Sequence, residues 1–212
     1  MLAFAAPAAA GELYLSLETA PPARPGQEAE AAPGRFVLHD DGTLYVGGTQ
    51  QFAAGRLEKG ELKEIGKRLD KLRKSTPGLG GPISFGPGEQ RFRLKATKGK
   101  PIDVVVTGDP ETAPPNLRSL ASLVAELAAY QHPSLRPYRP AFYALRAREA
   151  DLAGGCREWT FPISPQQAVA APQPMAAAAA RGWPTGAQLA SACVGDKRYA
   201  VTLRPLLPGE VP

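Results

Sequence analysis

The chain has 212 residues, of which 43% are hydrophobic and 21% charged, and its formal net charge is +5. This balance is typical of a globular protein and excludes an intrinsically disordered chain. No apolar stretch of the sequence reaches the roughly 20 residues that a membrane-spanning helix needs, so no transmembrane segment is predicted.

The first residues resemble the end of a secretory signal peptide. Residues 1–10 form a short apolar run followed by small residues, but the positively charged start of such a peptide is missing. Either the true start lies upstream, or the run is an alanine-rich accident of a GC-rich genome. We interpret residues 1–10 as a signal-peptide remnant and expect a secreted or periplasmic protein.

A strand and a hairpin are predicted next. Every second residue from Leu13 to Leu17 is leucine, which indicates a half-buried strand with Tyr14 on its polar side. After a loop rich in proline and alanine, Asp41 and Gly42 separate two runs of high strand propensity. This dipeptide favours the positive φ angles of a tight hairpin turn.

A helix is predicted over residues 58–74, where leucine and isoleucine recur every three or four positions. Gly66 interrupts it at a cost of about 1 kcal/mol relative to alanine, either because close packing needs a glycine or because it is tolerated. Basic residues are frequent here, but acidic residues are mixed among them, with Glu64 and Arg68 spaced as an i,i+4 pair. This pattern is typical of a solvated helix face, and we expect no nucleic acid as partner.

The order strand–turn–strand–helix then recurs. Strands are predicted over residues 90–97 and 102–107, and a second helix over residues 116–130. Both units begin with an Arg-Phe pair, at Arg35 and at Arg91. The recurrence indicates either an ancient duplication of a ββα unit or the chance similarity of two ordinary hairpins.

The last part of the chain is less regular and contains both cysteines. Cys156 and Cys193 have neither C-x-x-C spacing nor a histidine nearby, so we predict that they form one disulfide, with two buried thiols as the alternative. Residues 150–212 are predicted to form a loop-rich cap and a final strand, tied together by this disulfide.

These elements predict an α+β fold, with an antiparallel sheet, two helices on one of its faces and the disulfide-tied irregular cap at the C-terminus. Residues 11–149 are assigned to the α+β domain. Residues 150–212 are assigned to the cap, as part of the same domain.

Short motifs resemble those of a group of bacterial proteins. Residues 199–210, the hairpin from Leu38 to Tyr45 and the Trp183-Pro184 pair are similar to segments of uncharacterised secreted proteins and lipoproteins of actinobacteria and related high-GC bacteria. This resemblance implies an exported bacterial protein and no particular activity. The hairpin and late helix are also similar to small bacterial inhibitors of metalloproteases, whose Gly-Gly-Phe signature is absent here.

No catalytic motif is complete. Ser84 lies in a near match to the nucleophile elbow, but Pro82 stands where the first glycine belongs. His39, Asp40 and Asp41 form the most reactive combination, suited to a general base or a metal ligand, but we interpret them as a polar hairpin tip. We therefore expect no catalytic residues, no metal and no cofactor.

Four aromatic residues fall near the expected disulfide: Trp159, Phe161, Trp183 and Tyr199. They would form either a small core under the cap or an aromatic binding patch. We predict a non-catalytic exported binding protein that uses this patch, with another protein or an envelope component as partner. The alternatives are a secreted hydrolase with scattered catalytic residues and a protein protease inhibitor.

Overall fold

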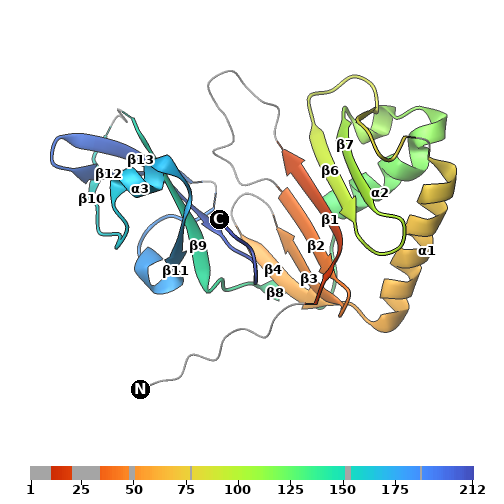
Figure 1. Cartoon of the computed structure of the whole chain (residues 1–212), viewed down its shortest axis with the longest axis horizontal. Helices are drawn as coiled ribbons and strands as arrows, with labels where there is room; N and C mark the ends of the chain where they lie inside the picture. Colours follow the sequence, from red (N-terminus) through yellow and green to blue (C-terminus); the bar gives the residue numbers. More distant parts are fainter. Residues whose placement is uncertain (1–10, 21–33, 48–50, 77, 151–153, 187) are drawn as a thin grey trace. The chain divides into compact units, whose positions relative to one another are not determined.

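The computed structural model in Figure 1 describes residues 11–20, 34–47, 51–76, 78–150, 154–186 and 188–212. The predicted signal-peptide remnant, residues 1–10, lies outside this range. The described residues up to Tyr138 form one compact unit, and those from Arg139 onward form a second. We refer to them as the helix unit and the disulfide unit.

The helix unit contains an eight-stranded sheet in the order β5-β7-β6-β1-β2-β3-β4-β8. All neighbouring strands are antiparallel except β5 and β7. The strands are β1 (Leu13–Ala20), β2 (Gly34–His39), β3 (Thr43–Gly47), β4 (Phe52–Arg56), β5 (Ile83–Ser84), β6 (Arg91–Ala96), β7 (Ile102–Thr107) and β8 (Arg136–Pro137). The early hairpin β2–β3 and the later hairpin β6–β7 therefore lie on opposite sides of β1.

The two predicted ββα units are not placed equivalently against β1. Phe36 pairs with Leu17, whereas Phe92 pairs with Thr19, so the two Arg-Phe pairs are offset by two positions along β1. The first unit also has an extra strand, β4, before its helix. An ancient duplication stays a prediction.

Two helices cover one face of this sheet, as predicted (Figure 1). Helix α1 (Lys59–Ser75) begins with a capping box, in which Glu61 accepts a hydrogen bond from the Glu58 N–H. Helix α2 (Arg118–Ala128) follows two short 3-10 turns, η1 (Pro110–Thr112) and η2 (Pro115–Leu117). Prolines in both turns fix the backbone and delay the start of α2.

The core of the helix unit follows from the alternation of its strands. In β6, Phe92, Leu94 and Ala96 are buried while Arg91 and Arg93 are exposed. The buried positions meet the apolar stripes of both helices, which include Leu69 and Leu120. Each large side chain of this kind contributes about 1.5–3 kcal/mol through its burial.

Strand β1 departs from the simple alternation that its sequence predicts. Its pairing with β2 shifts between Leu13 and Leu15, which is a β-bulge. A bulge re-aims the side chain at that point. Tyr14 is consequently buried in the same core cluster as Leu15, so its predicted placement on the polar side of the strand is wrong.

The disulfide unit contains a five-stranded sheet in the order β10-β12-β13-β9-β11. Its elements are β9 (Phe142–Glu149), β10 (Arg157–Glu158), α3 (Pro165–Ala170), β11 (Gln173–Ala176), the 3-10 turn η3 (Ala177–Ala180), β12 (Ala190–Val194) and β13 (Lys197–Pro205). The predicted disulfide between Cys156 and Cys193 is confirmed, with the two Cα atoms 5.8 Å apart.

The α+β class is confirmed, but the C-terminal region is more regular than the predicted cap. Residues 150–212 supply four strands of the second sheet, and the division of the chain precedes β9 instead of following it. These strands are hard to recognise because β10 has two residues and β12 consists mainly of alanine and serine, which have low strand propensity. The hydrogen bonds of its pairing with β13 stabilise β12, whose own residues have low strand propensity.

Candidate functional site

The four predicted aromatic residues do come together, inside the disulfide unit. Ring centroids lie 5.0 Å apart for Trp159 and Phe161, 5.6 Å for Trp159 and Tyr199, and 4.5 Å for Phe161 and Trp183. Phe161, Trp183 and Tyr199 are only 6%, 9% and 3% exposed, and Trp159 is half-buried. This burial supports the core interpretation, and a role in binding stays a prediction.

The cluster at residues 39–41 is dispersed. The His39 imidazole is hydrogen-bonded to the Gly11 carbonyl (2.6 Å), while Asp41 accepts bonds from the Thr43 N–H (2.9 Å) and hydroxyl (2.8 Å). The Thr43 N–H lowers the pKa of Asp41 in this turn. Within the described residues, no group of three His, Cys, Asp or Glu side chains could hold a metal ion.

One arrangement that the sequence did not reveal resembles a catalytic triad. His132 lies between Ser134 and Glu61, with 2.7 Å from its Nδ1 to the serine Oγ and 3.0 Å from its Nε2 to the glutamate Oε1. A serine beside an imidazole that is oriented by a carboxylate is the pattern of an activated nucleophile.

The surroundings of Ser134 indicate a structural clamp instead. Its Oγ accepts a hydrogen bond from the Arg56 N–H (3.0 Å) and lies 3.1 Å from the Arg56 carbonyl, so it bridges the end of β4 to the turn after α2. None of the three side chains lines either cavity described below. A nucleophile would need to reach a substrate, and this hydroxyl is occupied by backbone groups.

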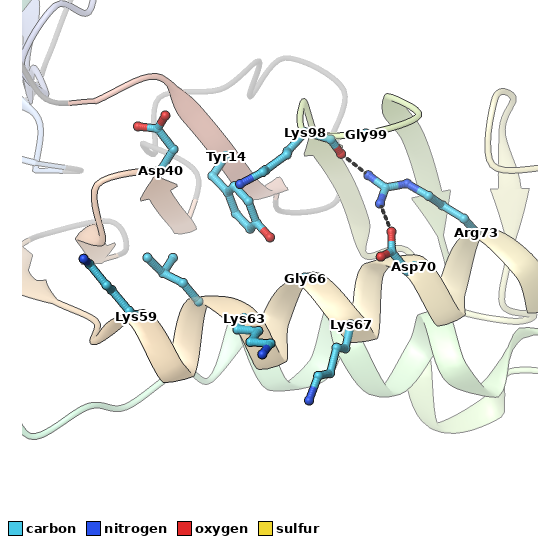
Figure 2. Close-up of a pocket in the computed structure, with 11 residues that line it drawn as sticks. Tyr14, Asp40, Lys59, Lys63, Gly66, Lys67, Asp70, Arg73, Lys98 and Gly99 are labelled. Atoms are coloured by element: carbon cyan, nitrogen blue, oxygen red, sulfur yellow. Dashed lines mark hydrogen bonds and ion pairs between the residues drawn. The ribbon is translucent and has the colours of Figure 1, made fainter.

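A cavity of about 630 Å³ lies between β1, helix α1 and the turn at residues 98–100 (Figure 2). We call it the Tyr14 groove. Its lining residues are Tyr14, Asp40, Lys59, Leu62, Lys63, Gly66, Lys67, Asp70, Arg73, Lys98 and Gly99. The volume is in the range of small-molecule sites, but the lining is unusually rich in cations.

Two local features bring Tyr14 into this groove. The bulge in β1 aims its ring at α1, and Gly66 leaves room for its hydroxyl, since a Cβ atom at Gly66 would lie 2.8 Å from the Tyr14 Oη. Close packing is therefore the reason for a glycine inside this helix. Burial raises the pKa of Tyr14, so the phenol keeps its proton at neutral pH and can donate a hydrogen bond.

Arg73 fixes the opposite wall of the groove. Its guanidinium donates to the carbonyls of Lys98 and Lys100 and to the Asp70 carboxylate, and its side chain is only 12% exposed. Gly99 takes φ +75°, which the tight turn requires. The clamped turn holds the Lys98 ammonium 5.6 Å from the centre of the Tyr14 ring, within range of a cation–π interaction (Figure 2).

The acidic residues of α1 are all engaged with other partners. Glu61 contacts His132, Glu64 pairs with Lys67 (2.6 Å), and Asp70 pairs with Arg73 (2.7 Å). The predicted i,i+4 pair is wrong, because Arg68 instead forms a two-pronged ion pair with Glu126 of α2 (2.6 and 2.7 Å).

Several lysines of the groove consequently have no carboxylate to pair with in the described part of the chain. Among the described residues, Lys59, Lys63 and Lys98 have no partner carboxylate, and Asp40 is the one lining carboxylate without a basic partner. An uncompensated Lys98 ammonium beside a phenol donor, with Lys59 and Lys63 on the α1 wall, suits the binding of an anion. The groove holds no serine, cysteine or histidine that could act as a nucleophile or general base.

Comparisons of the chain with family models, curated proteins and solved structures found no match. In the described part of the chain, no helix has the length and apolar character needed to cross a membrane.

Proposed function

We propose that the protein is an exported bacterial binding protein, not an enzyme, which holds an anionic group of its ligand in the Tyr14 groove. One observation carries this proposal. Lys98, on a turn that Arg73 holds in place, lies over the ring of Tyr14, which the bulge in β1 directs into the groove, and the acidic residues of α1 are already paired with other groups. In a purely structural ion-pair network the opposite charges would neutralise each other, whereas the ion pairs around the Tyr14 groove leave positive charge in a cavity.

Export is supported by the disulfide, because such bonds persist in oxidising compartments and are rare in the cytosol. The signal-peptide-like residues 1–10 and the resemblance of residues 199–210 to secreted actinobacterial proteins point the same way. The partner would then be an extracellular or envelope component that carries negative charge.

The expected affinity for a single small anion is weak. Exposed ion pairs contribute only about 0.2–1 kcal/mol each, so three lysines and a phenol predict binding no tighter than about millimolar. The clamp on the 98–100 turn reduces the ordering that binding requires, which improves affinity without adding contacts.

Titration with inorganic phosphate at low ionic strength tests the proposal, with the Gly99 backbone amide as the NMR reporter. Lys98→Gln should weaken phosphate binding up to about fivefold, since one ammonium of the groove is lost. Lys95→Gln is the matched control, because this substitution removes the same charge. Lys95 alternates with the buried residues of β6 and therefore lies on the opposite face of the sheet.

Two results would refute the proposal. One is the absence of any shift at Gly99 with phosphate well above millimolar concentration. The other is an equal loss of affinity in the Lys98→Gln and Lys95→Gln variants, which would indicate a response to net charge alone and no site.

A further inference from the structure

A second, smaller cavity lies on the other flank of α1, between α1 and α2. It has a volume of about 340 Å³ and is lined by Arg68, Lys71, Leu72, Arg118, Ser119, Ser122 and Leu123. Arg68 is paired with Glu126, but Lys71 and Arg118 have no carboxylate partner within the described parts of the chain. Two hydroxyls and two uncompensated cations make this cavity another place suited to an anionic group.

A row of lysines connects the two cavities. Lys59, Lys63, Lys67 and Lys71 recur every four residues along α1. Since an α-helix has 3.6 residues per turn, each step rotates the row by about 40° and advances it by about 6 Å. The first three lysines line the Tyr14 groove and the fourth lines the α1–α2 cavity.

The row therefore winds across the outer face of the helix, from one flank to the other. Figure 2 shows its middle part, where the Lys63 and Lys67 side chains point away from Tyr14. The apolar residues Leu69 and Leu72 occupy the inner face and pack into the core. One surface thus carries a row of lysines between two cavities, in which Lys67 pairs with Glu64 (2.6 Å) and the other three have no carboxylate partner among the described residues.

We infer that the ligand of the Tyr14 groove is a linear phosphodiester polymer without aromatic bases, which follows this lysine row over α1 into the α1–α2 cavity. The inference rests on the proposed function, because it extends the ligand of the same groove. The lysines recur along α1 at axial steps of about 6 Å, so a linear polyanion that follows the helix meets one lysine after another.

The same surface argues against a polymer that carries bases. Proteins that bind single-stranded nucleic acid interleave cations with exposed aromatic rings on which bases stack. The lining residues of the two cavities include one aromatic side chain, Tyr14, which is only 6% exposed and covered by Lys98. Recognition through charge spacing, with no stacking, fits this arrangement.

The probe is an abasic phosphodiester oligomer of about six units, which is longer than the roughly 18 Å between Lys59 and Lys71. Lys71→Gln should weaken its binding about threefold at low salt and should reduce the slope of log K against log salt by about 0.7. Lys95→Gln should change neither. The response of the Gly99 amide to inorganic phosphate should stay the same in the Lys71→Gln variant, because Lys71 lies outside the Tyr14 groove.

The outcomes separate this inference from the proposed function. If the native protein binds both probes but Lys71→Gln behaves like Lys95→Gln, the path over α1 is overturned and the Tyr14 groove stands. Tighter binding of oligothymidylate of equal length would also overturn it, in favour of a nucleic acid. If neither phosphate nor the oligomer binds, the proposed function fails and this inference fails with it.

Discussion

The two units of the chain use aromatic and charged residues in opposite ways. In the disulfide unit the tryptophans, Phe161 and Tyr199 pack against one another in the core. In the helix unit Tyr14 is directed into a groove in which Lys59, Lys63 and Lys98 lack acidic partners among the described residues. A cluster of aromatic residues in a sequence therefore indicates a core as readily as a binding patch. The better sign of a site is the chemistry left unsatisfied after packing.

Removal of the disulfide should affect one unit strongly and spare the other. Replacing both Cys156 and Cys193 by serine opens a loop with a sequence separation of 37. The chain-entropy model predicts a loss of roughly 4 kcal/mol. Both tryptophans of the chain, Trp159 and Trp183, lie in the disulfide unit, so thermal unfolding followed by tryptophan fluorescence reports on that unit alone.

Phosphate binding at the Gly99 amide serves as the control for the helix unit and should be unchanged in the double serine variant. A loss of phosphate binding together with the tryptophan transition would contradict the independence of the two units.

The fit between Tyr14 and α1 can be tested with a double-mutant cycle. In a Tyr14→Phe background, Gly66→Ala should stabilise the protein by about 1 kcal/mol, the usual gain of alanine over glycine in a helix. In the native background the new Cβ would lie 2.8 Å from the Tyr14 Oη, and the clash should cancel that gain. Urea unfolding followed by circular dichroism measures both steps. Equal effects in the two backgrounds would show that Tyr14 does not lie against Gly66.

The arrangement of Ser134, His132 and Glu61 allows a test between a binding protein and a hydrolase. Ser134→Ala should cost about 1 kcal/mol of stability, because it leaves the Arg56 backbone groups without their hydroxyl partner. It should leave hydrolysis of a p-nitrophenyl ester at the background rate shown by the native protein. Turnover by the native protein that disappears in Ser134→Ala would restore the hydrolase alternative.

The smallest expected effect is a pH dependence that arises in the helix unit. Hydrogen bonding to Arg68 lowers the pKa of Glu126 below its ordinary value of 4.5. The ion pair therefore stabilises the folded protein at neutral pH, and this contribution disappears as the pH falls below 4.5 through the lowered pKa.

The size of this effect is limited because the two side chains are 43% and 46% exposed, so the loss should be no more than about 1 kcal/mol. Glu126→Gln should remove this part of the acid sensitivity when urea midpoints are compared at pH 7 and pH 3. An unchanged acid sensitivity in the variant would exclude the pair as its source.

Local patterns were enough to predict α1, the β2–β3 hairpin and the disulfide. They were not enough for Tyr14, since an inserted bulge reverses the alternation on which its placement depended. The second sheet was missed because β12 gains its stability from pairing with β13 and not from its own residues. The groove joins residues 14, 66 and 98, and no short-range pattern connects positions so far apart. Gly66 was the one local sign of the groove, because a glycine inside a helix lowers its stability and therefore indicates close packing at that point.

The large sheet of the helix unit ends on both sides in a strand of two residues, β5 and β8. Open sheet edges can recruit a strand from another molecule, which is a common route to aggregation. Here each edge strand is only two residues long, and Pro137 in β8 lacks an N–H to donate. Short edge strands of this kind limit the pairing of the large sheet with another chain.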